Sequence, residues 1–190
     1  MNDLILLFKS PKDLLSKEDI KLQRPIIYIY ITIILLNSYI NIYYIENQDL
    51  ISLSKFFNIS NIVLFLISVF TALFTLLICV NLTYFFISLF VTIFEESTFD
   101  KKQLKNLIYV SYMIPFILNY LINIFFGLIQ KESLPLILMN INSIFIYMVV
   151  SLFIYTIIKY TIRTKKLHNI LPILIFIINA AASFISIIRK

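Results

Sequence analysis

The stretch "FFNISNIVLFLISVFTALFTLLICVNLTYFFISLFVTIF", residues 56–94, decides how this chain folds. It holds 39 residues without a charged side chain, a glycine or a proline. A continuous helix of that length would be about 58 Å long, whereas the hydrocarbon core of a bilayer is about 30 Å thick. The stretch is therefore either one overlong membrane-spanning helix or a hairpin of two spans.

The rest of the chain is built in the same way. It has 190 residues, of which 61% are hydrophobic and 14% are charged, which is too apolar for a soluble domain. Four further uncharged runs are each long enough to cross a bilayer: Pro25–Ile45, Asn106–Gln130, Ser133–Ile158 and Asn169–Ile188. We predict an all-α integral membrane protein in which residues 1–190 form a single domain. We attribute the net charge of +6 to basic residues that set the membrane topology, and we predict no nucleic-acid binding.

The distribution of basic residues favours one long span over a hairpin. With one span, alternate segments carry 12 basic residues on one side and 4 on the other, whereas a hairpin gives 8 against 8. Cytoplasmic loops carry the excess of lysine and arginine. The prediction is five transmembrane helices with a cytosolic N-terminus and an external C-terminus. The spans lie near residues 25–45, 58–94, 106–130, 133–158 and 169–188.

Two cytosolic segments are basic and resemble helix starts. Residues 1–24 form a leader that is predicted to hold a short interfacial helix, with a loose leader as the alternative. Before the third span, Lys101, Lys102 and Lys105 are placed at the level of anionic lipid headgroups. Their expected role is to anchor the topology, and the alternative is contact with an acidic surface of a partner.

Catalytic and metal-binding patterns do not emerge from the sequence. The single histidine, His168, is read as a solvated loop residue, and the single cysteine, Cys79, as a small core residue. We therefore expect a protein that is not an enzyme and that has no cofactor and no metal site.

Neutral polar residues recur at helical spacing inside the spans. In the third span these are Tyr112, Asn119 and Asn123, together with Pro115, and in the fifth Asn179, Ser183 and Ser186. The fourth span carries Asn140, Ser143, Tyr147, Ser151 and Tyr155. The second span has two such faces, first Asn61, Ser68, Thr71 and Thr75, then Asn81, Tyr84, Ser88 and Thr92. We expect these faces to point inward because amides that face lipid lack partners. They serve either packing or a polar conduit.

The two faces of the second span differ by roughly 140° at about 100° per residue. The helix is therefore expected to change neighbours near residue 80, with a kink or an outer half in the membrane interface.

The passage "STFDKKQLKNLIYVSYMIPFIL", residues 97–118, resembles the YIP family (Ypt-interacting proteins) in its short bacterial form. The resemblance rests on five spans, on the pair Thr98-Phe99 before the third span, and on Tyr112 and Pro115 within it. It implies a non-enzymatic multi-pass protein of a bacterial cytoplasmic membrane that works through partners, with Phe99 beside the lysines as a contact residue.

Two functional hypotheses follow. The first is a protein that binds a membrane partner and assists its assembly or regulation, with a transporter complex as a candidate partner. The alternative is passive transport or lipid translocation along the neutral polar faces.

Overall fold

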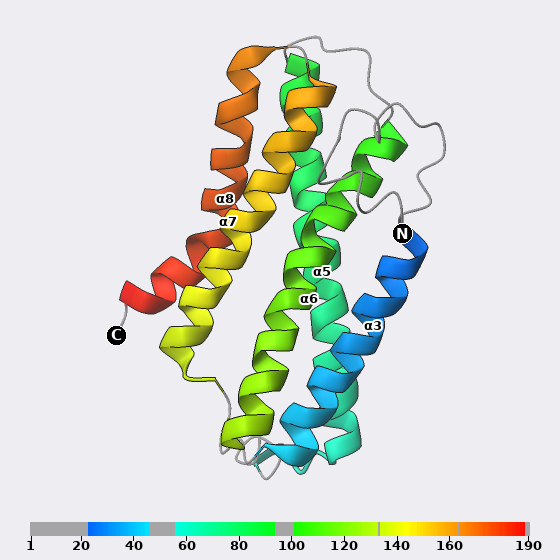
Figure 1. The fold of residues 1–190 in the computed structure, drawn as a ribbon, viewed down its shortest axis with the longest axis vertical. Helices are drawn as coiled ribbons and strands as arrows, with labels where there is room; N and C mark the ends of the chain where they lie inside the picture. Colours follow the sequence, from blue (N-terminus) through cyan, green and yellow to red (C-terminus); the bar gives the residue numbers. More distant parts are fainter. Residues whose placement is uncertain (1–22, 46–55, 94–100, 133, 163, 189–190) are drawn as a thin grey trace.

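The computed structural model describes residues 23–45, 56–93, 101–132, 134–162 and 164–188. These residues form helices and short connections, without a strand (Figure 1). The helices are α3 (Gln23–Tyr39), the π-helix η1 (Ile40–Tyr44), α5 (Asn61–Ile93), α6 (Lys101–Gln130), α7 (Leu136–Thr161) and α8 (Lys165–Ile188). The all-α prediction is confirmed for this part of the chain. The interfacial helix predicted in the leader lies outside the described residues, as does Phe99.

Four helical segments are long and apolar enough to cross a membrane: Pro25–Tyr44, Asn61–Ile93, Leu104–Gln130 and Ile137–Lys159. The second of them is α5, a single helix of 33 residues, so the hairpin alternative is wrong. No glycine or proline interrupts this stretch, and its carbonyls are satisfied within the helix at membrane depth. The length and composition of these four helices suit a helical membrane protein.

The helices run alternately down and up along one bundle (Figure 1). Helix α6 lies at its centre and contacts α3, α5 and α7, while α8 packs mainly on α7. The start of α6, the end of α7 and the start of α8 lie at one end of the bundle, near the end of α5 (Figure 1). The ends of α6 and η1 lie at the other end.

The core is an aliphatic cluster in which two tyrosines are fully buried. Residues from α3, α5, α6, α7 and α8 contribute to it, and the largest buried side chains include Tyr30 and Tyr112. Helix α5 buries residues only in its second half, from Leu76 to Val91. Its first half nevertheless contacts α3, because Ser68 and Ser38 share a hydrogen bond of 2.9 Å. In its second half Thr83 bonds Tyr112 of α6.

The chain's single glycine, Gly127, allows the last turns of the first span and of α6 to approach closely. The first span ends as a π-helix, in which Ile45 donates its N–H to the carbonyl of Ile40 at 3.0 Å. A Cβ atom at position 127 would overlap the end of the Ile45 side chain and touch Ile40. Glycine therefore leaves the space into which this isoleucine packs.

Candidate functional site: polar contacts between helices

A buried tyrosine joins three helices through its hydroxyl group. Tyr112 of α6 has no exposed surface, and its Oη lies 2.6 Å from Oγ1 of Thr83 on α5. The amide Nδ2 of Asn179 on α8 donates to the same oxygen at 2.8 Å and to the carbonyl of Ile175 at 2.7 Å. Both N–H groups of this amide are therefore used. We call Thr83, Tyr112 and Asn179 the tyrosine node.

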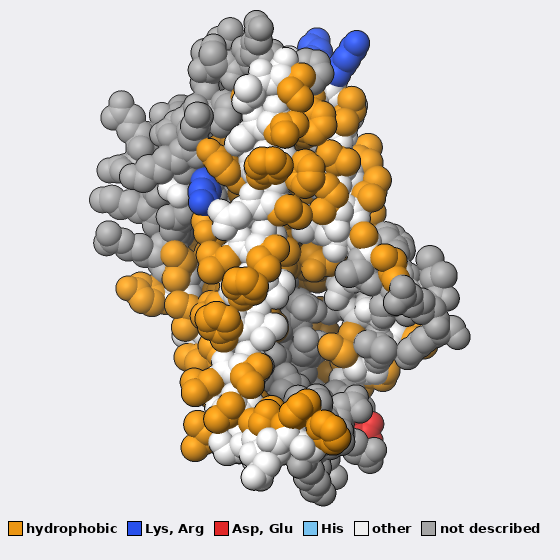
Figure 2. Space-filling view, turned by 180° about the vertical axis from the view of Figure 1, so that it is seen from behind, with side chains coloured by type: hydrophobic (Ala, Val, Ile, Leu, Met, Phe, Trp, Pro, Cys, Tyr) orange, Lys and Arg blue, Asp and Glu red, His pale blue; other side chains and the backbone are white. Residues whose placement is uncertain are grey.

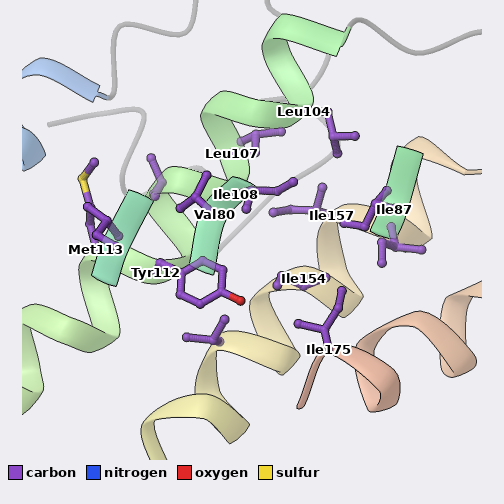
Figure 3. Packing of buried hydrophobic residues seen from close by; sticks show 14 of the residues in the cluster. Val80, Ile87, Leu104, Leu107, Ile108, Tyr112, Met113, Ile154, Ile157 and Ile175 are labelled. Atoms are coloured by element: carbon purple, nitrogen blue, oxygen red, sulfur yellow. The ribbon is translucent and has the colours of Figure 1, made fainter. Parts of the chain in front are cut away.

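The tyrosine node sits inside the apolar core. Figure 3 shows Tyr112 among buried aliphatic side chains, among them Ile108 of its own helix, Val80 of α5 and Ile154 of α7. In such a setting, a hydroxyl without a partner costs more than in water, because no solvent replaces the lost bond. The node thus holds α5, α6 and α8 at one relative rotation.

A second contact joins α6 and α7 through two amides. Asn142 donates from Nδ2 to Oδ1 of Asn119, and both side chains are partly buried. Sequence reasoning singled out Asn119 but missed Asn142 and chose Asn140 on α7. These two α7 asparagines lie roughly 200° apart around the helix axis. Asn140 is partly buried as well.

The remaining polar groups of α7 contact other neighbours. Ser151 donates to the carbonyl of Pro172 in α8 at 2.8 Å. The Tyr147 ring meets that of Phe116 edge-on, with 6.3 Å between the ring centres. Ser143 bonds back to the carbonyl of Met139 in its own helix. The polar face expected on α7 is thus divided between two neighbouring helices and α7 itself.

The expectation that polar faces point inward is wrong for most of α5. Thr71, Thr75, Asn81 and Thr92 have exposed side chains. Thr75, Asn81 and Thr92 donate to carbonyls four residues earlier in the same helix. Such bonds satisfy a hydroxyl or one amide N–H without any neighbour, so these side chains can face outward.

Three buried polar atoms have no hydrogen-bond partner among the described residues: Oδ1 of Asn37, Oγ of Ser88 and Oδ1 of Asn123. Asn123 is one helical turn beyond Asn119 on α6, and Asn37 is on the neighbouring helix α3. Buried polar atoms of this kind mark strain or a place where water enters.

Pro115 is buried in the interior of α6. Its ring removes the N–H that would bond the carbonyl of Ser111, while the Ser111 hydroxyl donates to the carbonyl of Leu107 at 2.9 Å. Both features relax the helical ladder in the turn beside Tyr112.

We expect Pro115→Ala to fold normally and to keep its free energy of unfolding within about 1 kcal/mol, because the regained hydrogen bond offsets the space left by the ring. Denaturant titration in mixed micelles, followed by circular dichroism, measures this. Pro25→Ala, at the exposed start of α3, is the control. A Pro115→Ala chain that fails to fold would contradict this account.

Lysines and aromatic rings meet at the end of the bundle where α6 begins. Lys101 and Lys102 are the first residues of α6. The Lys105 ammonium lies over the ring of Tyr84 in α5, 5.7 Å from its centre. Lys159 lies 6.0 Å above the Tyr155 ring of its own helix. Such cation–π pairs hold basic groups close to the apolar surface.

His168 is not the solvated loop residue that the sequence suggested. It lies in the first turns of α8, partly buried, and its Nε2 is 2.7 Å from the carbonyl of Ile162 at the end of α7. Because a carbonyl only accepts, Nε2 carries the proton. The histidine therefore closes the turn between α7 and α8. Its neighbours Asn169 and Lys165 on the same helix are exposed.

No protein-family model, curated protein or solved structure matches the chain.

Proposed function

We propose that the chain is a non-enzymatic multi-pass membrane protein that binds another membrane protein and assists its assembly or regulation. One observation carries this proposal: several polar side chains form hydrogen bonds from one helix to another. The tyrosine node, the Asn119–Asn142 pair and the Ser151 contact use these groups to fix helix positions. The remaining surface of the helices is broadly apolar (Figure 2). The resemblance to the YIP family points to the same kind of role.

In this proposal α8 is a fifth span, the N-terminus is cytosolic and the C-terminus lies outside. Helix α8 has 24 residues, which is sufficient for a bilayer core of about 30 Å. Lys105, Lys159 and Lys165 belong to the end of the bundle that the positive-inside rule assigns to the cytosol. Anionic headgroups are the proposed ligands of these lysines, together with Lys101 and Lys102, and the membrane is a bacterial cytoplasmic one.

Labelling of single cysteines tests this orientation. On a Cys79→Ala background, we expect Lys165→Cys to react with a membrane-impermeant maleimide only after the cytosolic side is opened. Glu132→Cys, at the other end of α6, should react in intact cells. Both side chains are exposed, so access to the reagent depends on the side of the membrane. Labelling of Lys165→Cys in intact cells would overturn the orientation.

Co-purification in mild detergent tests the function. A membrane protein recovered in fixed stoichiometry, and lost when the lysines at positions 101, 102 and 105 are replaced by glutamine, would support the partner-binding role. The matched control is replacement of Lys131 and Lys190, which belong to the opposite side in this topology. Purification of the chain without a stoichiometric partner would contradict it.

Passive transport or lipid translocation is the second candidate, and the unpartnered buried oxygens of Asn37 and Asn123 favour it. Groups of this kind can accept hydrogen bonds from water or a polar solute inside the membrane. Flux into liposomes that contain the purified chain alone would support this candidate. An Asn123→Leu variant that retains the same flux would show that this amide has no part in it.

A further inference from the structure

One amide in the structure is exposed in the middle of a membrane-spanning helix. Among the asparagines of the described residues, Asn58, Asn61, Asn81 and Asn169 have exposed side chains. Asn58 precedes α5, while Asn61 and Asn169 belong to the first turns of α5 and α8. Asn81 differs, because it lies 20 residues into α5 and 12 before its end.

With α5 centred in the bilayer, Asn81 lies within the hydrocarbon core. A core about 30 Å thick takes about 20 residues of a helix, and it then covers roughly residues 67–87. The Asn81 amide donates one N–H to the carbonyl of Leu77 at 2.7 Å. An amide also has a second N–H and a carbonyl oxygen, and on this exposed side chain neither has a partner among the described residues. Lipid has no group to bond them.

Asn81 belongs to an outward-facing seam on α5. Positions spaced alternately by four and three residues follow a period of 3.5, which is the spacing of a two-helix contact. All of these positions are exposed except Ser88, which is partly buried and has its Oγ buried within the single chain. The α5 seam consists of Ile67, Thr71, Phe74, Ile78, Asn81, Phe85, Ser88 and Thr92.

The location of the seam makes it available to another helix. Helix α5 lies behind α6 in Figure 1, so the reverse view in Figure 2 looks onto its outer side, where apolar side chains are spread over the surface. Helices α3 and α6 cover its inner side, together with contacts from α8. The lipid-facing positions of α7, such as Phe145, Met148 and Leu152, are apolar by comparison.

We infer that α5 is a self-association helix, and that two copies of this chain pair along the α5 seam with their Asn81 amides hydrogen-bonded to each other. A two-fold axis along the membrane normal brings the same residue of both copies to the same depth. An amide is its own complement, since it both donates and accepts. A second copy therefore supplies the partner that Asn81 needs at that depth. This inference does not depend on the proposed function.

Disulfide cross-linking in liposomes tests the geometry. On a Cys79→Ala background, we expect Asn81→Cys to give a cross-linked dimer on mild oxidation. Met148→Cys is the matched control, because Met148 is also exposed but lies in the middle of α7. If Asn81→Cys cross-links no more than Met148→Cys, α5 does not face α5 and the inference is overturned.

The role of the amide is tested without cysteine, by energy transfer between labelled chains diluted in liposomes. We expect Asn81→Leu to raise the dimer dissociation constant about tenfold, since the hydrogen bonds between the Asn81 amides of the two copies are lost. The control is Thr75→Val, which removes an exposed hydroxyl of α5 outside the seam. If the purified chain stays monomeric at all densities, the seam either binds a different protein or faces lipid, and the inference is overturned.

Discussion

Tyr112→Phe should lower the free energy of unfolding by about 1–2 kcal/mol. The substitution removes one oxygen and keeps the ring, so the apolar packing of the core is retained. The lost hydroxyl bonds both Thr83 and Asn179, at 2.6 and 2.8 Å, and no part of Tyr112 is exposed. Each bond between membrane helices contributes about 0.6 kcal/mol on average, and leaving buried partners unpaired costs up to about 1–3 kcal/mol.

Unfolding by sodium dodecyl sulfate in mixed micelles, followed by circular dichroism, measures the change. Tyr28→Phe is the matched control, since this tyrosine of α3 is 70% exposed and should lose almost nothing. In a Thr83→Val background, Tyr112→Phe should lower the free energy of unfolding by less than it does alone, because the hydrogen bond between Thr83 and Tyr112 is already lost. Equal losses in both backgrounds would show that the two hydroxyls are not coupled.

The largest contrast in the free energy of unfolding is expected between single and double substitutions of the paired amides of α6 and α7. Asn119→Leu or Asn142→Leu alone leaves the other amide partly buried without its partner, at a cost of about 0.5–2 kcal/mol. Replacement of both by leucine removes the unpaired group as well, so the double variant should recover most of the loss.

The same titration gives all four corners of this cycle, and the coupling energy follows from them. Leucine at an exposed position such as Ile122 of α6 is the control for a change of side chain on the lipid face. A double variant whose loss equals the sum of the two single losses would show that Asn119 and Asn142 do not depend on each other.

The helices of this bundle follow from residue spacing alone. Uncharged runs marked where α5 and α7 begin and end to within a few residues, and the distribution of basic residues predicted one span near residues 58–94, where α5 covers Asn61–Ile93. The lysines before the third span belong to α6. A helix can continue past the end of its apolar run and beyond the membrane surface. In the absence of water, each backbone N–H and C=O group must find its hydrogen-bond partner within the protein, and a continuous helix provides these partners.

The partners of the polar side chains could not be predicted in the same way. Helix α5 has apolar residues on every side, so its period carries no sign of which face meets α6. Thr83 is buried there, whereas Thr75 and Asn81 are exposed, and nothing in the sequence distinguishes these three residues. The choice between Asn140 and Asn142 on α7 likewise depends on how the helix is rotated, which many aliphatic contacts decide together. An exposed threonine or asparagine can also bond its own helix, which hides it from arguments based on partners.

The length of α5 has a consequence for the lipids around it. Its 33 uncharged residues measure about 50 Å, well beyond the 20 residues of the first span beside it. Neighbouring lipids cannot match both helices, so acyl chains stretch along α5 and relax around the shorter spans. The cost of this distortion falls as the bilayer thickens, and also when another long helix replaces stretched lipid beside α5. A longer acyl chain thus lowers the mismatch at α5 and raises it at the shorter spans of the same bundle.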